Sequence, residues 1–183
     1  ACPDTALPNT AQDLSTILVT AIRNYVGDKD AQKAFLNEVK GLDDRCRVRM
    51  NENVASKGKE PFKDILRSEV DQLTSIAEGA RAEFMTIIDK LPLAYNDVSA
   101  IYRSVEKKSP GNGGIFSIFV SDLCKGCGEC VQVCGDHDAL RMVTETPELN
   151  AELTSAQVFS RLLPDTSQKY LGLYNDDTPE ASR

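Results

Sequence analysis

The chain has 183 residues, of which 41% are hydrophobic, and this length supports one core of ordinary size or a small module with a second structural layer. Its formal net charge of −7 argues against a nucleic-acid partner, because phosphate backbones attract concentrated Lys and Arg. No stretch approaches the roughly 20 apolar residues of a membrane span, and the N-terminal residues lack the pattern of a secretory signal, so we expect a soluble, cytoplasmic protein with no membrane partner.

Apolar residues at spacings of three and four predict several helices in the N-terminal two thirds of the chain. Thr10 is a good N-cap for the first helix, and Gly41 is expected to end the second. Pro61 suits the first position of a long third helix that no other proline interrupts before residue 92, and the fourth is expected to fold back on it as a hairpin. These helices are predicted at residues 10–25, 29–39, 61–91 and 94–107.

A polar stretch, residues 43–60, is expected to be a mostly irregular connection. Most of the one basic cluster lies in this stretch, interrupted by Asp and Glu. The cluster fits either an ordinary solvated face or a docking site for an acidic partner or a phosphate group. Its members are Arg45, Arg47, Arg49, Lys57, Lys59 and Lys63.

The character of the sequence changes at residues 110–114, a run of Pro, Gly and Asn that predicts a domain boundary. Residues 115–120 form a β-rich run of strand length that leads directly into a group of cysteines. A second strand is expected at residues 139–143 and a last helix at 155–163. The polar residues 175–183 are typical of a linker or a disordered tail.

Cysteines are the most informative residues of this chain. Four of the six lie within eleven residues in the order C-x2-C-x2-C-x3-C, which is the ferredoxin spacing for a 4Fe–4S cluster. Gly126 and Gly128 let the loop turn sharply and bring backbone N–H groups close to the cluster sulfur atoms. Zinc is the alternative, but structural zinc sites usually combine two separated C-x2-C pairs. The cysteines are Cys2, Cys46, Cys124, Cys127, Cys130 and Cys134.

The fourth ligand beside Cys124, Cys127 and Cys130 is a choice between two cysteines. In two-cluster ferredoxins the fourth cysteine of each motif binds the other cluster and is commonly followed by proline. Cys2-Pro3 resembles the end of such a motif, so Cys2 is the predicted fourth ligand and Cys134 the alternative. About 120 residues separate Cys2 from Cys124. Closing a flexible loop of this length costs roughly 4 kcal/mol, and a helical insert that folds on itself removes most of that cost.

Several features together resemble the ferredoxin-like domain of pyruvate and other 2-oxoacid:ferredoxin oxidoreductases. They are the cluster motif, the strand residues 116–120 before it, the remote segment 2–7 and the long insertion between them. Residues 162–166 and 170–173 also resemble the linker toward the thiamine-diphosphate domain of that family. Two features depart from the family pattern, because Gly135 stands where proline usually follows the last cysteine and a complete first motif is missing.

The resemblance implies an α+β fold, a ferredoxin-like 4Fe–4S core interrupted by a large helical insertion. It divides the chain into a first part of the core (residues 1–9), the insertion (10–110), the cluster-binding part (111–150) and a linker (151–183). The implied function is electron transfer within a 2-oxoacid oxidoreductase, whose thiamine diphosphate and coenzyme A would bind elsewhere in the enzyme. Implied partners are its other domains or subunits, with ferredoxin or flavodoxin as electron acceptor. The chain shows no thiamine-diphosphate signature of its own.

Two other function classes stay open: a stand-alone ferredoxin-like carrier or subunit of another redox enzyme, and a structural cluster or zinc module. Among single residues, Cys46 is expected to be a free structural thiol rather than a reactive one. His137 is expected to be a solvated loop residue, and Lys125 either raises the cluster potential or is merely exposed. Tyr170 and Tyr174 are expected to be packing residues.

Overall fold

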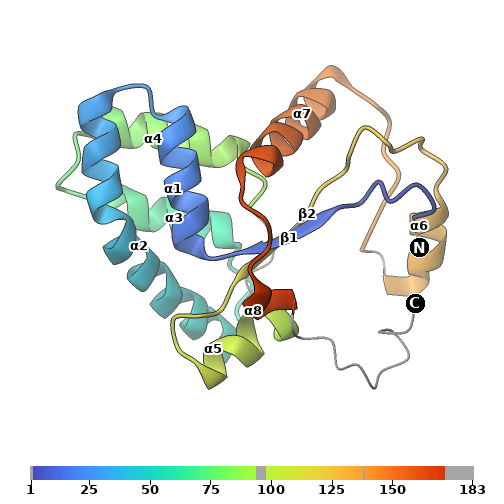
Figure 1. Cartoon of the computed structure of the whole chain (residues 1–183), viewed down its shortest axis with the longest axis horizontal. Helices are drawn as coiled ribbons and strands as arrows, with labels where there is room; N and C mark the ends of the chain where they lie inside the picture. Colours follow the sequence, from blue (N-terminus) through green and yellow to red (C-terminus); the bar gives the residue numbers. More distant parts are fainter. Residues whose placement is uncertain (1, 94–97, 138, 172–183) are drawn as a thin grey trace.

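A computed structural model describes residues 2–93, 98–137 and 139–171. Over these residues the chain has an α+β fold, mostly helical with a two-stranded antiparallel sheet. Figure 1 shows helices α1 to α4 on one side, the cysteine segment with α6 on the other, and the sheet running between them. The strands are β1 (Asn9–Gln12) and β2 (Ile115–Ile118); the helices are α1 (Leu14–Tyr25), α2 (Lys29–Ala55), α3 (Phe62–Asp71), α4 (Glu78–Lys90), α5 (Ser104–Lys108), α6 (Glu129–Cys134), α7 (Pro147–Leu162) and α8 (Gln168–Leu171).

Helix α1 lies close to its predicted position but begins later. Thr10 is not its N-cap: the residue belongs to β1, and Asp13 holds the N-cap position in extended conformation. The helix ends before Gly27, as the sequence indicated. Residues 10–12 are extended because β1 pairs with β2, a partner more than 100 residues away that no local pattern reveals.

Helix α2 contradicts the prediction of a short helix followed by an irregular connection. It continues through Gly41 and covers residues 43–55 as well. The helix continues because Leu42, Cys46 and Met50 extend its apolar stripe and are all buried. That burial outweighs the cost of about 1 kcal/mol for a glycine inside a helix.

The three arginines of the basic cluster are held in ion pairs on α2. Arg45 and Arg49 both contact the carboxylate of Glu69 on α3, whose side chain is only 5% exposed. Arg47, 6% exposed, contacts two further carboxylates. Each of these arginines is therefore paired with at least one acid of the fold.

The predicted single helix over residues 61–91 is also wrong, and so is the hairpin built on it. Residues 72–77 separate α3 from α4, and the two helices pack against each other. Leu73 and Ile76 within this connection are both buried, which explains a turn without glycine or proline. In the predicted fourth helix, residues 94–97 lie outside the described part, and a π-helical turn at Ser99–Arg103 precedes α5.

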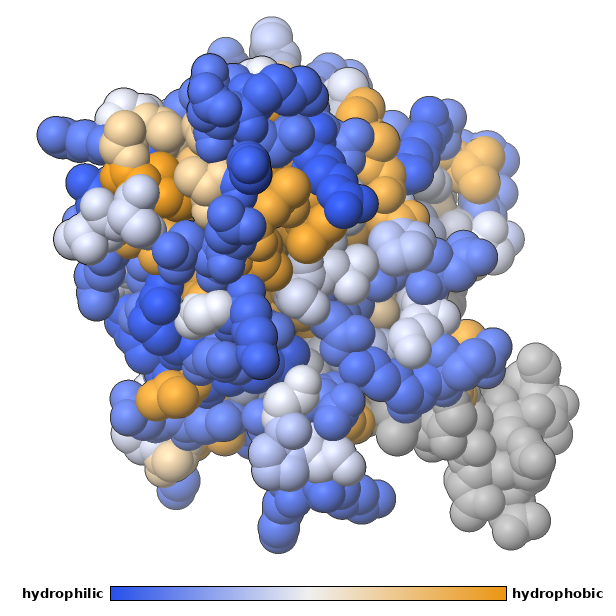
Figure 2. All heavy atoms as spheres, turned by 60° about the vertical axis from the view of Figure 1, so that its left-hand side comes forward, coloured by the Kyte–Doolittle hydropathy of each residue, from blue (hydrophilic) through white to orange (hydrophobic). Residues whose placement is uncertain are grey.

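One apolar core joins α1 to α4 with side chains from distant segments. The Phe35 and Phe84 rings lie 4.6 Å apart between centroids, and Tyr102 and Phe159 are buried in the same cluster. Hydrophilic residues cover most of the face seen in Figure 2, with apolar groups visible between them. The helices therefore bury their apolar stripes against one another, as predicted. In the described part of the chain, no helix is both long and apolar enough to cross a membrane.

The C-terminal half differs from the prediction in two elements. Residues 139–143 form no strand, and Met142 and Val143 are exposed at 54% and 64%. Helix α7 begins at Pro147, earlier than the predicted residue 155, because Thr146 caps it by accepting a hydrogen bond from the backbone N–H of Leu149. The strand predicted at residues 115–120 is present and ends at residue 118. Tyr174 and residues 175–183 lie outside the described residues.

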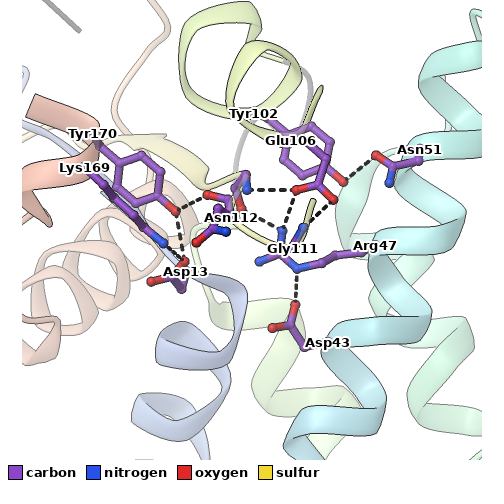
Figure 3. A network of polar contacts seen from close by, with 11 residues as sticks. Asp13, Asp43, Arg47, Asn51, Tyr102, Glu106, Gly111, Asn112, Lys169 and Tyr170 are labelled. Atoms are coloured by element: carbon purple, nitrogen blue, oxygen red, sulfur yellow. Dashed lines mark hydrogen bonds and ion pairs between the residues drawn. The ribbon is translucent and has the colours of Figure 1, made fainter. Parts of the chain in front are cut away.

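A polar network fastens the loop before β2 to the helices (Figure 3). Arg47 donates from Nε to Asp43 at 2.8 Å and from Nη1 to the carbonyl oxygen of Gly113, also at 2.8 Å. Glu106 accepts from the backbone N–H groups of Gly111 and Gly113 at 3.0 and 2.9 Å. The loop that leads into the cysteine segment is thereby held to α2 and α5.

Electrostatics in this network follow from the burial of its charges. Burial tends to raise the pKa of Glu106, but the two backbone hydrogen bonds and the Arg47 charge hold that pKa below its usual range. Burial raises the pKa of Asp43, although Arg47 acts in the opposite direction. Tyr170 on α8 is 3% exposed, and its hydroxyl lies 3.0 Å from Asp13 Oδ1 and 3.1 Å from the carbonyl oxygen of Asn112. Its predicted packing role is confirmed.

Candidate iron-sulfur site

The central feature of the site is the loop that carries Cys124, Cys127 and Cys130. Gly126 and Gly128 have φ values of +67° and +77°, a left-handed conformation that residues with a Cβ rarely adopt. Helix α6 begins after Gly128, whose carbonyl oxygen accepts from the N–H groups of residues 131 and 132. The loop thus turns tightly twice, as its glycines predicted.

The N-terminal segment lies beside this loop because the β1–β2 pairing continues past the strands. Asn9 pairs with Ile118 at the end of the ladder. Beyond it, the N–H of Phe119 donates to the carbonyl oxygen of Pro8, and the N–H of Ser121 donates to that of Ala6, both at 2.9 Å. These bonds bring the residues that follow Cys2 alongside those that precede Cys124, and Figure 1 shows the N-terminal segment running toward α6.

A compact turn presents Cys2. The N–H of Thr5 donates to the carbonyl oxygen of Cys2 at 3.3 Å, and Thr5 has a φ of +51°. The N–H of Ala6 donates to Cys2 Sγ at 3.3 Å. Hydrogen bonds of this kind stabilise a thiolate and help to tune a metal site.

Four cysteines line one pocket. Cys2, Cys124, Cys127 and Cys130 line a small pocket with a cavity volume of about 30 Å³. Cys134, on the last turn of α6, is not among the residues that line it. The Cys134 sulfur instead accepts a hydrogen bond from the N–H of Ala139 at 3.2 Å. Tertiary structure therefore brings the three loop cysteines together with Cys2 and leaves Cys134 outside.

The residues of the pocket have the chemistry of a metal–thiolate site. The donor set is four thiols, the ligands both of 4Fe–4S clusters and of zinc sites built from four cysteines. Cys124 and Cys127 are exposed, and Cys2 and Cys130 are half-buried. Over the described residues, no three His, Cys, Asp or Glu side chains are gathered closely enough for a single metal ion.

Two other candidate residues lie apart from the pocket. Cys46 is fully buried in α2, and burial, with the charges of Glu69 and Asp43, raises its pKa to about 12. A thiol with this pKa is not a reactive nucleophile, so its prediction as a structural thiol is confirmed. His137 is exposed in a short 3₁₀ turn after α6, which confirms it as a solvated loop residue.

Sequence reasoning missed one contact at the site. Lys125 Nζ lies 3.1 Å from Asp4 Oδ1, so the two segments that carry the cysteines are joined by an ion pair. The pair was detectable in principle, because an acid follows Cys2 by two positions and a base follows Cys124 directly. Only the pairing of the two segments shows that these charges meet.

Comparisons with known proteins give no relative for this chain: no family model, no curated protein and no solved structure matches it. The likeness to 2-oxoacid oxidoreductases therefore depends on the residues described above, and it stays a prediction.

Proposed function

We propose that this chain binds one 4Fe–4S cluster through Cys124, Cys127, Cys130 and Cys2 and that it transfers single electrons. One observation carries the proposal: a cysteine 122 positions before the ferredoxin-spaced loop lines the same pocket as its first three cysteines. Such a cluster supplies one-electron redox chemistry at low potential. The chain contributes the thiolates, the turns at Gly126 and Gly128, and the N–H that donates to Cys2 Sγ.

The wider setting of this electron transfer is a 2-oxoacid (pyruvate-type):ferredoxin oxidoreductase. The support is the resemblance of segments 2–7, 116–120 and 123–135 to the ferredoxin-like domain of that family. In this setting the chain receives electrons from a thiamine-diphosphate centre in another domain or subunit and passes them toward ferredoxin or flavodoxin. A stand-alone ferredoxin-like carrier, or a subunit of another redox enzyme, is the second candidate.

The test is reconstitution of the purified chain under anaerobic conditions with ferrous iron and sulfide. We expect four irons and four sulfides per chain, a broad visible absorption, and bleaching of that absorption by dithionite. After the excess dithionite is removed, the reduced protein should pass its electron to an added acceptor whose spectrum differs from that of the cluster, such as a cytochrome, and regain its colour as the acceptor becomes reduced. Zinc bound in place of iron, or a colour that dithionite does not bleach, would overturn the proposal.

Variants separate a site-bound cluster from iron bound elsewhere. Alanine at position 124, 127 or 130 should abolish the visible absorption or leave a damaged three-iron cluster. The matched control is Cys46→Ala, which removes a thiol from the helical core and should leave the absorption unchanged. Full four-iron occupancy in all three loop variants would contradict the ligand assignment.

A further inference from the structure

The inference concerns the exposed ion pair beside the site, and it rests on the proposed cluster. Asp4 lies two residues after Cys2, and Lys125 lies directly after Cys124. Lys125 Nζ and Asp4 Oδ1 are 3.1 Å apart, with 73% and 33% of their side chains exposed. The ion pair thus joins the segment that carries Cys2 to the loop that carries Cys124, close to both cysteines.

In the described part of the chain, the backbone hydrogen bonds between the two segments end before residues 2–5, which carry Cys2. Among the described residues, the last backbone bond between the two segments runs from the N–H of Ser121 to the carbonyl oxygen of Ala6. Residues 2–5 extend beyond that bond as a turn held internally. The Asp4–Lys125 contact links this turn to the cysteine loop on the far side of the last backbone bond.

We propose that Asp4 and Lys125 form a clamp that positions the Cys2 thiolate on the iron-sulfur cluster. Both are positioning residues, because they act through Cys2. The pair also sets the local field: a positive charge near the cluster favours the reduced, more negative state, and a negative charge disfavours it. The two residues therefore act together on geometry and in opposite directions on potential.

This opposition makes the clamp testable with Asp4→Asn, Lys125→Gln and the double variant. Ferricyanide removes one electron from the four-iron cluster, which then releases one Fe²⁺ ion and leaves a three-iron cluster. The rate of that release, followed with an Fe²⁺ chelator, reports how firmly the fourth corner is held. Asp122→Asn is the matched control, since Asp122 is an exposed aspartate two residues before Cys124.

Each single variant should release iron about 2- to 5-fold faster than the unaltered protein, the range expected for a surface ion pair. The double variant should be no faster than the faster single variant, because both changes break one contact. Asp4→Asn should raise the midpoint potential and Lys125→Gln should lower it. High salt should speed release from the unaltered protein but not from the variants.

Three results would overturn the clamp. The first is release rates that change in opposite directions in the two single variants, which a pure field effect would give. The second is single-variant effects that multiply in the double variant, and the third is single variants that match Asp122→Asn. These results need a bound cluster, so they leave the proposed function standing, whereas a chain that binds no iron would remove both proposals.

Discussion

Replacing Cys2 and Cys134 in turn separates the two possible ligands of the fourth iron. Cys2→Ala removes a sulfur that lines the pocket, so the cluster should be lost or reduced to three irons. Cys134→Ala removes a half-buried thiol that accepts one hydrogen bond from Ala139. This second change should keep four irons and cost about 1 kcal/mol of unfolding free energy.

The structure also indicates how much the bond between Cys2 and the proposed cluster, here called the Cys2 link, contributes to the free energy of unfolding. Joining residues 2 and 124 through a flexible chain of about 120 residues costs about 4 kcal/mol. The bond between Ala6 and Ser121 already closes most of that loop. About seven residues remain, for which closure costs at most about 2 kcal/mol, because the turn at residues 2–5 and the Asp4–Lys125 pair already order part of them. Cutting the link should therefore release a short arm and leave the helical body folded.

The assay combines iron analysis and EPR of the oxidised protein with urea unfolding followed by circular dichroism. We expect the three-iron EPR signal, or no cluster, in Cys2→Ala, and a change of less than about 2 kcal/mol in the unfolding of the helices. A Cys134→Ala protein that loses its cluster while Cys2→Ala keeps four irons would refute the reasoning. Unfolding of the helical body in Cys2→Ala would refute the estimate for the link.

Three further predictions concern the rest of the fold. Arg47→Met leaves the carboxylates of Asp43 and Glu106 without their cation. It should lower the free energy of unfolding, measured in urea, by about 3 to 5 kcal/mol. A loss below about 1 kcal/mol would contradict this. The pKa of Glu106 is lower in the folded than in the unfolded protein, so the ionised carboxylate contributes to the free energy of unfolding. This contribution is present above the unfolded pKa of 4.5 and is lost as the pH falls below that value. In Glu106→Gln, melting temperatures measured over a series of pH values should therefore fall less at acid pH than in the unaltered protein. The same fall in both proteins would exclude this contribution of Glu106. Between Phe119 and Phe159 no described side chain is buried, so the proposed cluster is expected to hold this segment in place. Removing iron should therefore speed amide hydrogen exchange at residues 121–137 and leave exchange in α1 to α4 unchanged.

Local sequence determined the features that depend on neighbours along the chain. The spacing of Cys124, Cys127 and Cys130 predicts a cluster loop because ligands three residues apart on a tight turn can converge without help from elsewhere. Gly126 and Gly128 were expected to turn the chain sharply, and both have positive φ. The apolar spacing in α1 likewise predicted a helix, since one turn of helix aligns residues three and four apart.

Tertiary structure decided the features that depend on distant partners. Gly41 remains helical because the residues after it pack against α3, and Thr10 is extended because β2 supplies its backbone partners. The same pairing extends to Ala6 and Ser121 and sets Cys2 beside the cysteine loop. The motif rule for two-cluster proteins could suggest Cys2 as a ligand, but only the long-range ladder places it there, because hydrogen bonds between segments more than 100 residues apart leave no periodic trace in either segment.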